Sequence, residues 1–118
     1  MTRGSGAWLV GLGVLYGAVA SAQSPPVPDP ARIEAGRQVY EREKCASCHQ
    51  IAGRGNSRFP LDGVAKKLTT DQIRRWITDT ARMEDALPRM PAVRMSARRY
   101  RLNTRDLDAL VLYLGTLR

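Results

Sequence analysis

The sequence predicts a small all-α domain, and three observations lead to that class. The last part of the chain has the clearest helical spacing, with apolar residues at Leu107, Leu110, Val111, Leu114 and Leu117. Two earlier segments have shorter patterns of the same kind. No segment alternates with period two for long enough to predict a strand. We therefore expect three or more helices joined by long loops, and helices this short make a thin core unless something fills the loops.

The N-terminal residues 1–22 have the layout of a secretory signal peptide. A positive start, Met1-Thr2-Arg3, precedes an uncharged apolar run over residues 7–19, and Ala20-Ser21-Ala22 fits a cleavage site. The run is shorter than the roughly 20 residues that a spanning helix needs. We therefore expect cleavage near Ala22 and a periplasmic protein with no stable membrane insertion, rather than one that keeps an uncleaved anchor.

Residues 23–30 form a Pro-rich linker, and residues 31–118 form the predicted domain. Cleavage leaves 96 residues with a formal net charge of +7. A domain of this size usually needs a disulfide, a metal or a large cofactor. Its two cysteines lie three positions apart, which argues against a disulfide framework and favours a cofactor.

The excess of Arg and Lys predicts steering toward partners with acidic docking faces. Nucleic acid is excluded as a partner because the exported chain has one Phe and no nucleic-acid-binding motif.

The elements follow in order from local signals. Asp29-Pro30 predicts an N-cap and first helical residue, and the helix that follows includes Gly36, which we expect to allow a close approach to another helix. Residues 50–68 predict a long loop. Thr69 and Gln72 have the spacing of a capping box before a short helix, residues 81–100 are irregular, and Asn103 or Thr104 caps the last helix.

Cys45-Ala46-Ser47-Cys48-His49 is the C-x-x-C-H pattern of covalent haem attachment. Two intervening residues let both thiols reach one edge of a porphyrin, and the adjacent imidazole can bind the iron. A thioredoxin-like redox pair needs a βαβ context, and a zinc site needs four ligands. Cys45, Cys48 and His49 are the only Cys and His in the chain. We therefore predict one covalent haem c, with Cys45 and Cys48 as thioethers and His49 as proximal iron ligand.

The distal iron ligand is open among several residues. No second His exists in the chain, so the candidates are the methionines and lysines of the domain, or an open site. These residues are Met83, Met90, Met95, Lys44, Lys66 and Lys67. A methionine thioether is a soft ligand that raises the reduction potential and closes the iron to small molecules.

Together these motifs resemble class I monohaem cytochromes c over about residues 31–117. The resemblance rests on CASCH (45–49), FPLDGV (59–64), LTTDQIRRWI (68–77), RMPAV (89–93) and LDALVLYLGTL (107–117).

The resemblance implies further residue roles. It implies that the first and last helices cross at Gly36 and Tyr113, that the Pro60 carbonyl accepts the His49 Nδ1 proton, and that Trp76 lies near the haem or in the core. Met90-Pro91 has the Met-Pro form of the family's distal ligand, so Met90 is the expected ligand. Met95 is the alternative, because it lies at the more usual distance from the last helix.

The resulting hypothesis is an electron carrier, not an enzyme, that moves single electrons between redox partner proteins. Two alternatives stay open: the haem subunit of a larger oxidoreductase, and a five-coordinate haem protein that binds a small ligand. The presence of a distal iron ligand would distinguish the carrier from the five-coordinate haem protein. The sequence names neither the electron donor nor the acceptor.

Overall fold

The computed structural model describes Met1, residues 27–98 and residues 100–118. The predicted signal peptide, beyond Met1, lies outside these residues. Five α-helices occur in the described ranges, which confirms the predicted all-α class. None of them has both the length and the apolar character needed to cross a bilayer.

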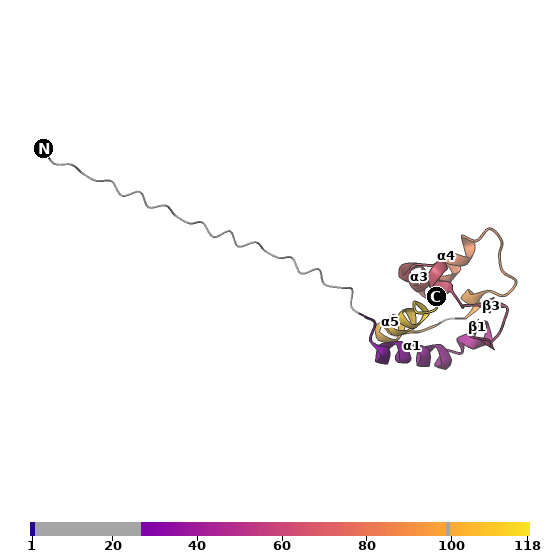
Figure 1. Cartoon of the computed structure of the whole chain (residues 1–118). Coiled ribbons are helices and arrows are strands. Elements are labelled where there is room, and N and C mark those ends of the chain that lie inside the picture. Colours follow the sequence, from indigo (N-terminus) through magenta and orange to yellow (C-terminus); the bar gives the residue numbers. More distant parts are fainter. Residues whose placement is uncertain (2–26, 99) are drawn as a thin grey trace.

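The first and last helices, α1 (Pro30–Arg42) and α5 (Thr104–Leu114), cross each other, as Figure 1 shows. Gly36 is buried at the crossing. A Cβ at this position would lie 2.0 Å from the Ala109 carbonyl oxygen and 2.6 Å from Tyr113 Cβ. The crossing at Gly36 and Tyr113 therefore agrees with the expectation, and it requires a residue without a side chain.

Side-chain caps begin both crossing helices where the sequence predicts. The Asp29 carboxylate accepts a hydrogen bond from Ala31 N at 3.0 Å, and Pro30 is the first helical residue. Asn103, rather than Thr104, caps α5 and accepts from Asp106 N at 2.8 Å. The core lies between these helices and includes Val39 and Val111, which are 2% and 1% exposed.

The third large helix, α3 (Thr70–Thr78), packs its buried Ile73 into the same core. The predicted capping box is present, because the Thr69 hydroxyl accepts from Gln72 N at 3.3 Å and Thr69 N donates to the Gln72 side chain at 2.8 Å. A further helix, α4 (Thr80–Asp85), follows at once. The sequence predicts irregular chain there, and that prediction is wrong because a six-residue helix without a side-chain cap leaves no readable signal.

The loop predicted over residues 50–68 contains more regular structure than expected. Strand β1 (His49–Ile51) lies between β2 (Arg54–Gly55), which is antiparallel to it, and β3 (Phe59–Pro60), which is parallel. A single-turn helix, α2 (Val64–Lys67), completes the segment. Strands of two or three residues are too short to show alternation, which explains why the sequence predicts none.

Candidate functional site

An apolar cavity of about 280 Å³ lies between the helices and the loops. Nearly all of its wall is hydrocarbon, and the wall side chains come from every large helix as well as from the loops. Helices α1, α3, α4 and α5 contribute Tyr40, Ile73, Trp76, Ile77, Glu84, Leu110 and Leu114. The rest of the chain, including α2, contributes Glu43, Cys45, Cys48, His49, Phe59, Leu61, Val64, Leu68, Leu87, Pro91, Val93, Met95, Tyr100 and Leu102. The cofactor that the sequence predicts between the loops therefore has an apolar cavity to occupy.

The three residues of the C-x-x-C-H motif all lie in this wall. Residues 45–47 form a short 3₁₀ turn directly after α1, and His49 begins β1. The two cysteines are partly buried and do not form a disulfide. Burial raises the pKa of the Cys45 thiol to about 11. The structure thus brings both thiols and the imidazole to one cavity, as the sequence predicts.

His49 is oriented by a main-chain carbonyl. Its Nδ1 lies 2.9 Å from the Phe59 carbonyl oxygen, so Nδ1 carries the proton and donates it, leaving Nε2 with a free lone pair. Burial lowers the pKa of His49. A neutral imidazole held by a hydrogen bond on one nitrogen is the usual state of a metal-binding histidine.

The carbonyl belongs to Phe59 and not to Pro60, so that expectation is corrected. The reason lies in the strand register, because β1 and β3 are parallel and pair His49 with Phe59 and Gln50 with Pro60. The residue opposite His49 supplies the acceptor. The register of two-residue strands was not readable from the sequence.

Gly55 and Asn56 contact the main chain of the C-x-x-C-H motif, and the sequence analysis did not predict this contact. Asn56 N lies 3.0 Å from the Ala46 carbonyl oxygen and 3.1 Å from the His49 carbonyl oxygen, and the Asn56 side chain donates to the Ser47 carbonyl at 3.2 Å. Gly55 has a φ of +100°, and a Cβ there would lie 2.2 Å from the His49 carbonyl oxygen. The Gly-Asn pair shortly after the motif is typical of turns and could have indicated this contact.

The two main candidates for the distal ligand occupy different places. Met95, in the short helical turn η2 (Met95–Ala97), lies in the cavity wall. Met90 is 47% exposed and is not part of that wall. Met83, Lys44, Lys66 and Lys67 are not wall residues either. Among the candidates within the described residues, the structure brings only Met95 together with His49 in one cavity.

The donor set and the cavity fit a haem. An apolar space receives a macrocycle, the paired thiols at one side can form thioethers, and the free Nε2 of His49 and the sulfur of Met95 are suitable ligands for haem iron. No group of three or more His, Cys, Asp or Glu in the described residues forms another metal site.

A small helical domain with a C-x-x-C-H turn in the wall of an apolar cavity is the design of a covalent haem protein. The chain matches the family model for cytochrome c over residues 33–118, and it therefore belongs to the cytochrome c family. Haem c is the family's covalent cofactor, and its members are generally electron carriers rather than enzymes. No curated protein and no solved structure matches the chain.

Proposed function

We propose that this protein is an exported electron carrier with one haem c, bound through Cys45 and Cys48 and coordinated by His49 and Met95. The observation that carries the proposal is the joint position of the motif and one methionine in a single apolar cavity. When bound, haem c supplies an iron that gains or loses one electron. The rest of the proposal concerns what the side chains of this chain do.

We expect His49 to keep one orientation whether the haem iron is oxidised or reduced. The bond from Nδ1 to the Phe59 carbonyl fixes the tautomer and the plane of the ring, so Nε2 stays directed at one point. The main chain behind it is fixed by Asn56. A rigid ligand means that little atomic movement accompanies electron transfer, which suits a carrier.

Met95 replaces Met90 as the proposed distal ligand. The expectation for Met90 comes from the Met-Pro pattern and is still untested. The position of Met95 in the wall supports the alternative, which also has the more usual distance from the last helix. With haem bound, the sulfur of Met95 would favour ferrous iron and would close the iron to a gas or an oxidant.

The first prediction tests this assignment with a matched pair of methionine variants. Met95→Ala should abolish the weak charge-transfer band of ferric haem with a thioether ligand, lower the reduction potential and allow carbon monoxide to bind the reduced protein. Met90→Ala should keep the band and the potential because its side chain is half exposed. Absorption spectroscopy and a redox titration of the holoprotein measure both.

The opposite pattern would assign the ligand to Met90 and keep the carrier. A wild-type protein without the band, which already binds carbon monoxide, would contradict the carrier and favour the five-coordinate alternative. Co-purification with a dehydrogenase would favour the haem subunit of a larger oxidoreductase.

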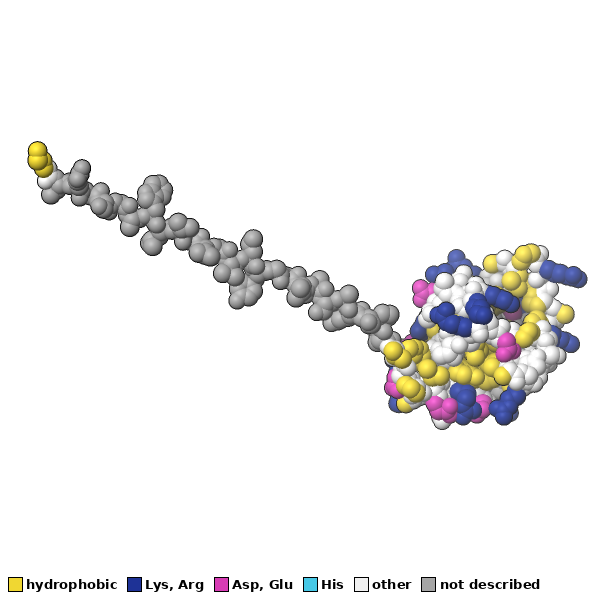
Figure 2. Space-filling view, in the orientation of Figure 1, with side chains coloured by type: hydrophobic (Ala, Val, Ile, Leu, Met, Phe, Trp, Pro, Cys, Tyr) yellow, Lys and Arg dark blue, Asp and Glu magenta, His cyan; other side chains and the backbone are white. Residues whose placement is uncertain are grey.

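We further propose that the electron partners meet the chain over the loops around the cavity and present acidic faces. Residues 44–102 contain 13 Lys or Arg and 5 Asp or Glu, whereas residues 27–43 and 103–118 together contain 5 basic and 6 acidic residues. In Figure 2, apolar side chains form a band across one face of the domain, and Lys and Arg side chains border it together with Asp and Glu. Export to the periplasm rests on the N-terminal sequence pattern.

A further inference from the structure

Glu84 is the most deeply buried charged residue among those described. It lies in α4, it is 1% exposed, and its side chain is part of the cavity wall. Burial of a carboxylate costs free energy unless donors compensate it. Its presence in an apolar wall therefore calls for an explanation in terms of its partners.

All the partners of the Glu84 carboxylate come from the segment that carries Met95. Arg94 Nε donates to Oε2 at 3.0 Å, Ser96 N donates to Oε1 at 3.2 Å, and the Ser96 hydroxyl donates to Oε2. These two residues are the chain neighbours of Met95 on either side. The carboxylate therefore holds the backbone on both sides of this methionine.

The set of donors matches an ionised carboxylate and not an amide. Each Glu84 oxygen accepts, and three groups donate to the pair. Burial raises the pKa of Glu84, but the hydrogen bonds from Ser96 and Arg94 outweigh it and leave the pKa below its ordinary value. A glutamine at position 84 would place its side-chain NH₂ group against one of these donors from Arg94 and Ser96.

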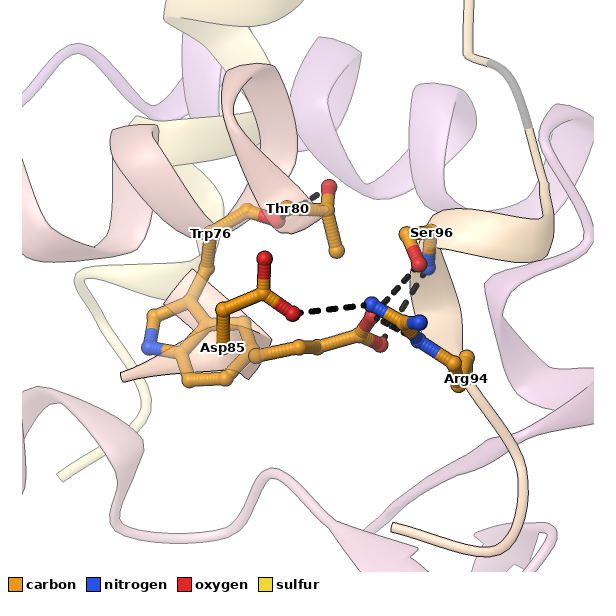
Figure 3. Close-up of polar contacts among 6 residues, drawn as sticks. Trp76, Thr80, Asp85, Arg94 and Ser96 are labelled. Carbon is orange, nitrogen blue, oxygen red and sulfur yellow. Dashed lines mark hydrogen bonds and ion pairs between the residues drawn. The ribbon is translucent and has the colours of Figure 1, made fainter. Parts of the chain in front are cut away.

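Asp85, the next residue, contacts the same arginine from outside. Its carboxylate lies 3.2 Å from Arg94, and its side chain is 66% exposed, whereas that of Glu84 is 2% exposed. In Figure 3, one dashed line joins Asp85 to Arg94, and the other dashed lines at Arg94 and Ser96 are their contacts with the Glu84 carboxylate. Two neighbouring acidic residues thus share Arg94, but only the buried one reaches Ser96.

We propose that Glu84 is a positioning residue for Met95: it holds residues 94–96 against the cavity so that the sulfur stays at the iron. The inference rests on the proposed function, because it takes Met95 as the distal ligand. Residues 86–93 have no helix or strand to fix them, and three of them, Leu87, Met90 and Val93, are exposed apolar residues. The contacts of Glu84 with Arg94 and Ser96, which we call the clamp, fix the chain where this irregular segment ends and the ligand must be held.

The test compares Glu84→Gln with Asp85→Asn as holoproteins. Each removes one carboxylate that contacts Arg94. Glu84→Gln should raise the rate at which imidazole replaces the thioether by about tenfold or more, and the charge-transfer band should disappear on heating well before the helical circular dichroism does. Asp85→Asn should stay within about twofold of the wild type because its pair is exposed.

Equal imidazole rates in Glu84→Gln and Asp85→Asn would overturn the proposal. Should Glu84→Gln fail to fold, Ser96→Ala is a milder change in the other half of the clamp, because it removes the hydroxyl donor and keeps the main-chain donor. A several-fold faster imidazole rate in Ser96→Ala supports the clamp, and an unchanged rate overturns it.

Met95→Ala separates the hypothesis that Met95 is the distal ligand from the hypothesis that Glu84 positions it. A band that persists in Met95→Ala contradicts the proposed ligand, and the positioning role falls with it. A band that is lost in Met95→Ala but equally stable in Glu84→Gln and in the wild type contradicts the positioning role alone.

Discussion

Single atoms decide the geometry at the crossing of α1 and α5. Gly36 leaves room for the Ala109 carbonyl oxygen at a point where a Cβ would lie 2.0 Å from it. Contact at this distance involves main-chain atoms on the facing helix, which move only if the whole helix shifts. Glycine is therefore required at position 36 because there is no room for a Cβ, and not because of its backbone conformation.

Gly36→Ala should lower the free energy of unfolding by about 1–3 kcal/mol or more, because the helices must move apart and the core loses contacts. Alanine otherwise favours a helix, so the direction is opposite to its intrinsic propensity. Gly115→Ala is the control, since its φ of −65° suits alanine and the nearest atom to its Cβ, the Val111 carbonyl oxygen, would lie at 3.2 Å. Chemical denaturation measures both variants. Equal stabilities would contradict the close packing.

The residues of the site differ in how far the sequence could predict them. The C-x-x-C-H motif was readable because its chemistry requires a fixed local spacing. The Phe59 carbonyl and the Glu84 clamp were not, because both depend on contacts between segments 10 to 12 residues apart whose register is set by the folded chain. Met90 and Met95 both fit the spacing, and the proposal for Met95 rests on its position in the cavity wall, which depends on the tertiary structure.

At the scale of elements, the helices that begin with a side-chain cap were the predictable ones. Asp29, Thr69 and Asn103 each accept a main-chain hydrogen bond at the start of α1, α3 and α5. Helices α2 and α4 have no such cap, and the sequence predicts neither. Short elements without caps are stabilised by their surroundings rather than by their own residues, so local patterns do not indicate them.

Asn103→Ala should cost about 1 kcal/mol of stability because it removes the acceptor for Asp106 N at the start of α5, the helix that contributes most to the core. Asn103→Ser is the control, since serine is an equally good cap and should recover most of the loss. Thermal unfolding followed by circular dichroism measures the two variants. A serine variant as unstable as the alanine variant would show that capping is not the cause.

At the scale of the whole molecule, positive charge is unevenly distributed. Helices α1 and α5 carry acidic and basic residues in balance, partly as pairs such as Arg42 with Asp106 at 2.7 Å. The excess of basic residues lies in the segment between them. The segment with the excess positive charge also supplies most of the residues of the cavity wall.

Electron transfer to an acidic partner should slow as ionic strength rises, because salt screens this positive charge over about 10 Å at 0.1 M. Lys67→Glu, next to the cavity wall at Leu68, should reduce the bimolecular rate at low salt. Arg32→Glu on α1 changes the net charge equally and should reduce it less. Stopped-flow measurements at several salt concentrations give the rates. Equal effects of the two variants would mean that only net charge matters.

The crossing of α1 with α5 also makes folding depend on a contact between the two ends of the domain. The 61 residues at 43–103 separate the two helices, and bringing them together costs chain entropy that is returned only when the core forms. Proteins in which many contacts join distant segments fold more slowly than proteins with mostly local contacts. Cys45 and Cys48 lie at the start of this long loop, and Cys45 packs against the core that the two helices form. The burial that raises the pKa of Cys45 therefore depends on the crossing, and we expect its thiol to react more readily before the core forms than after.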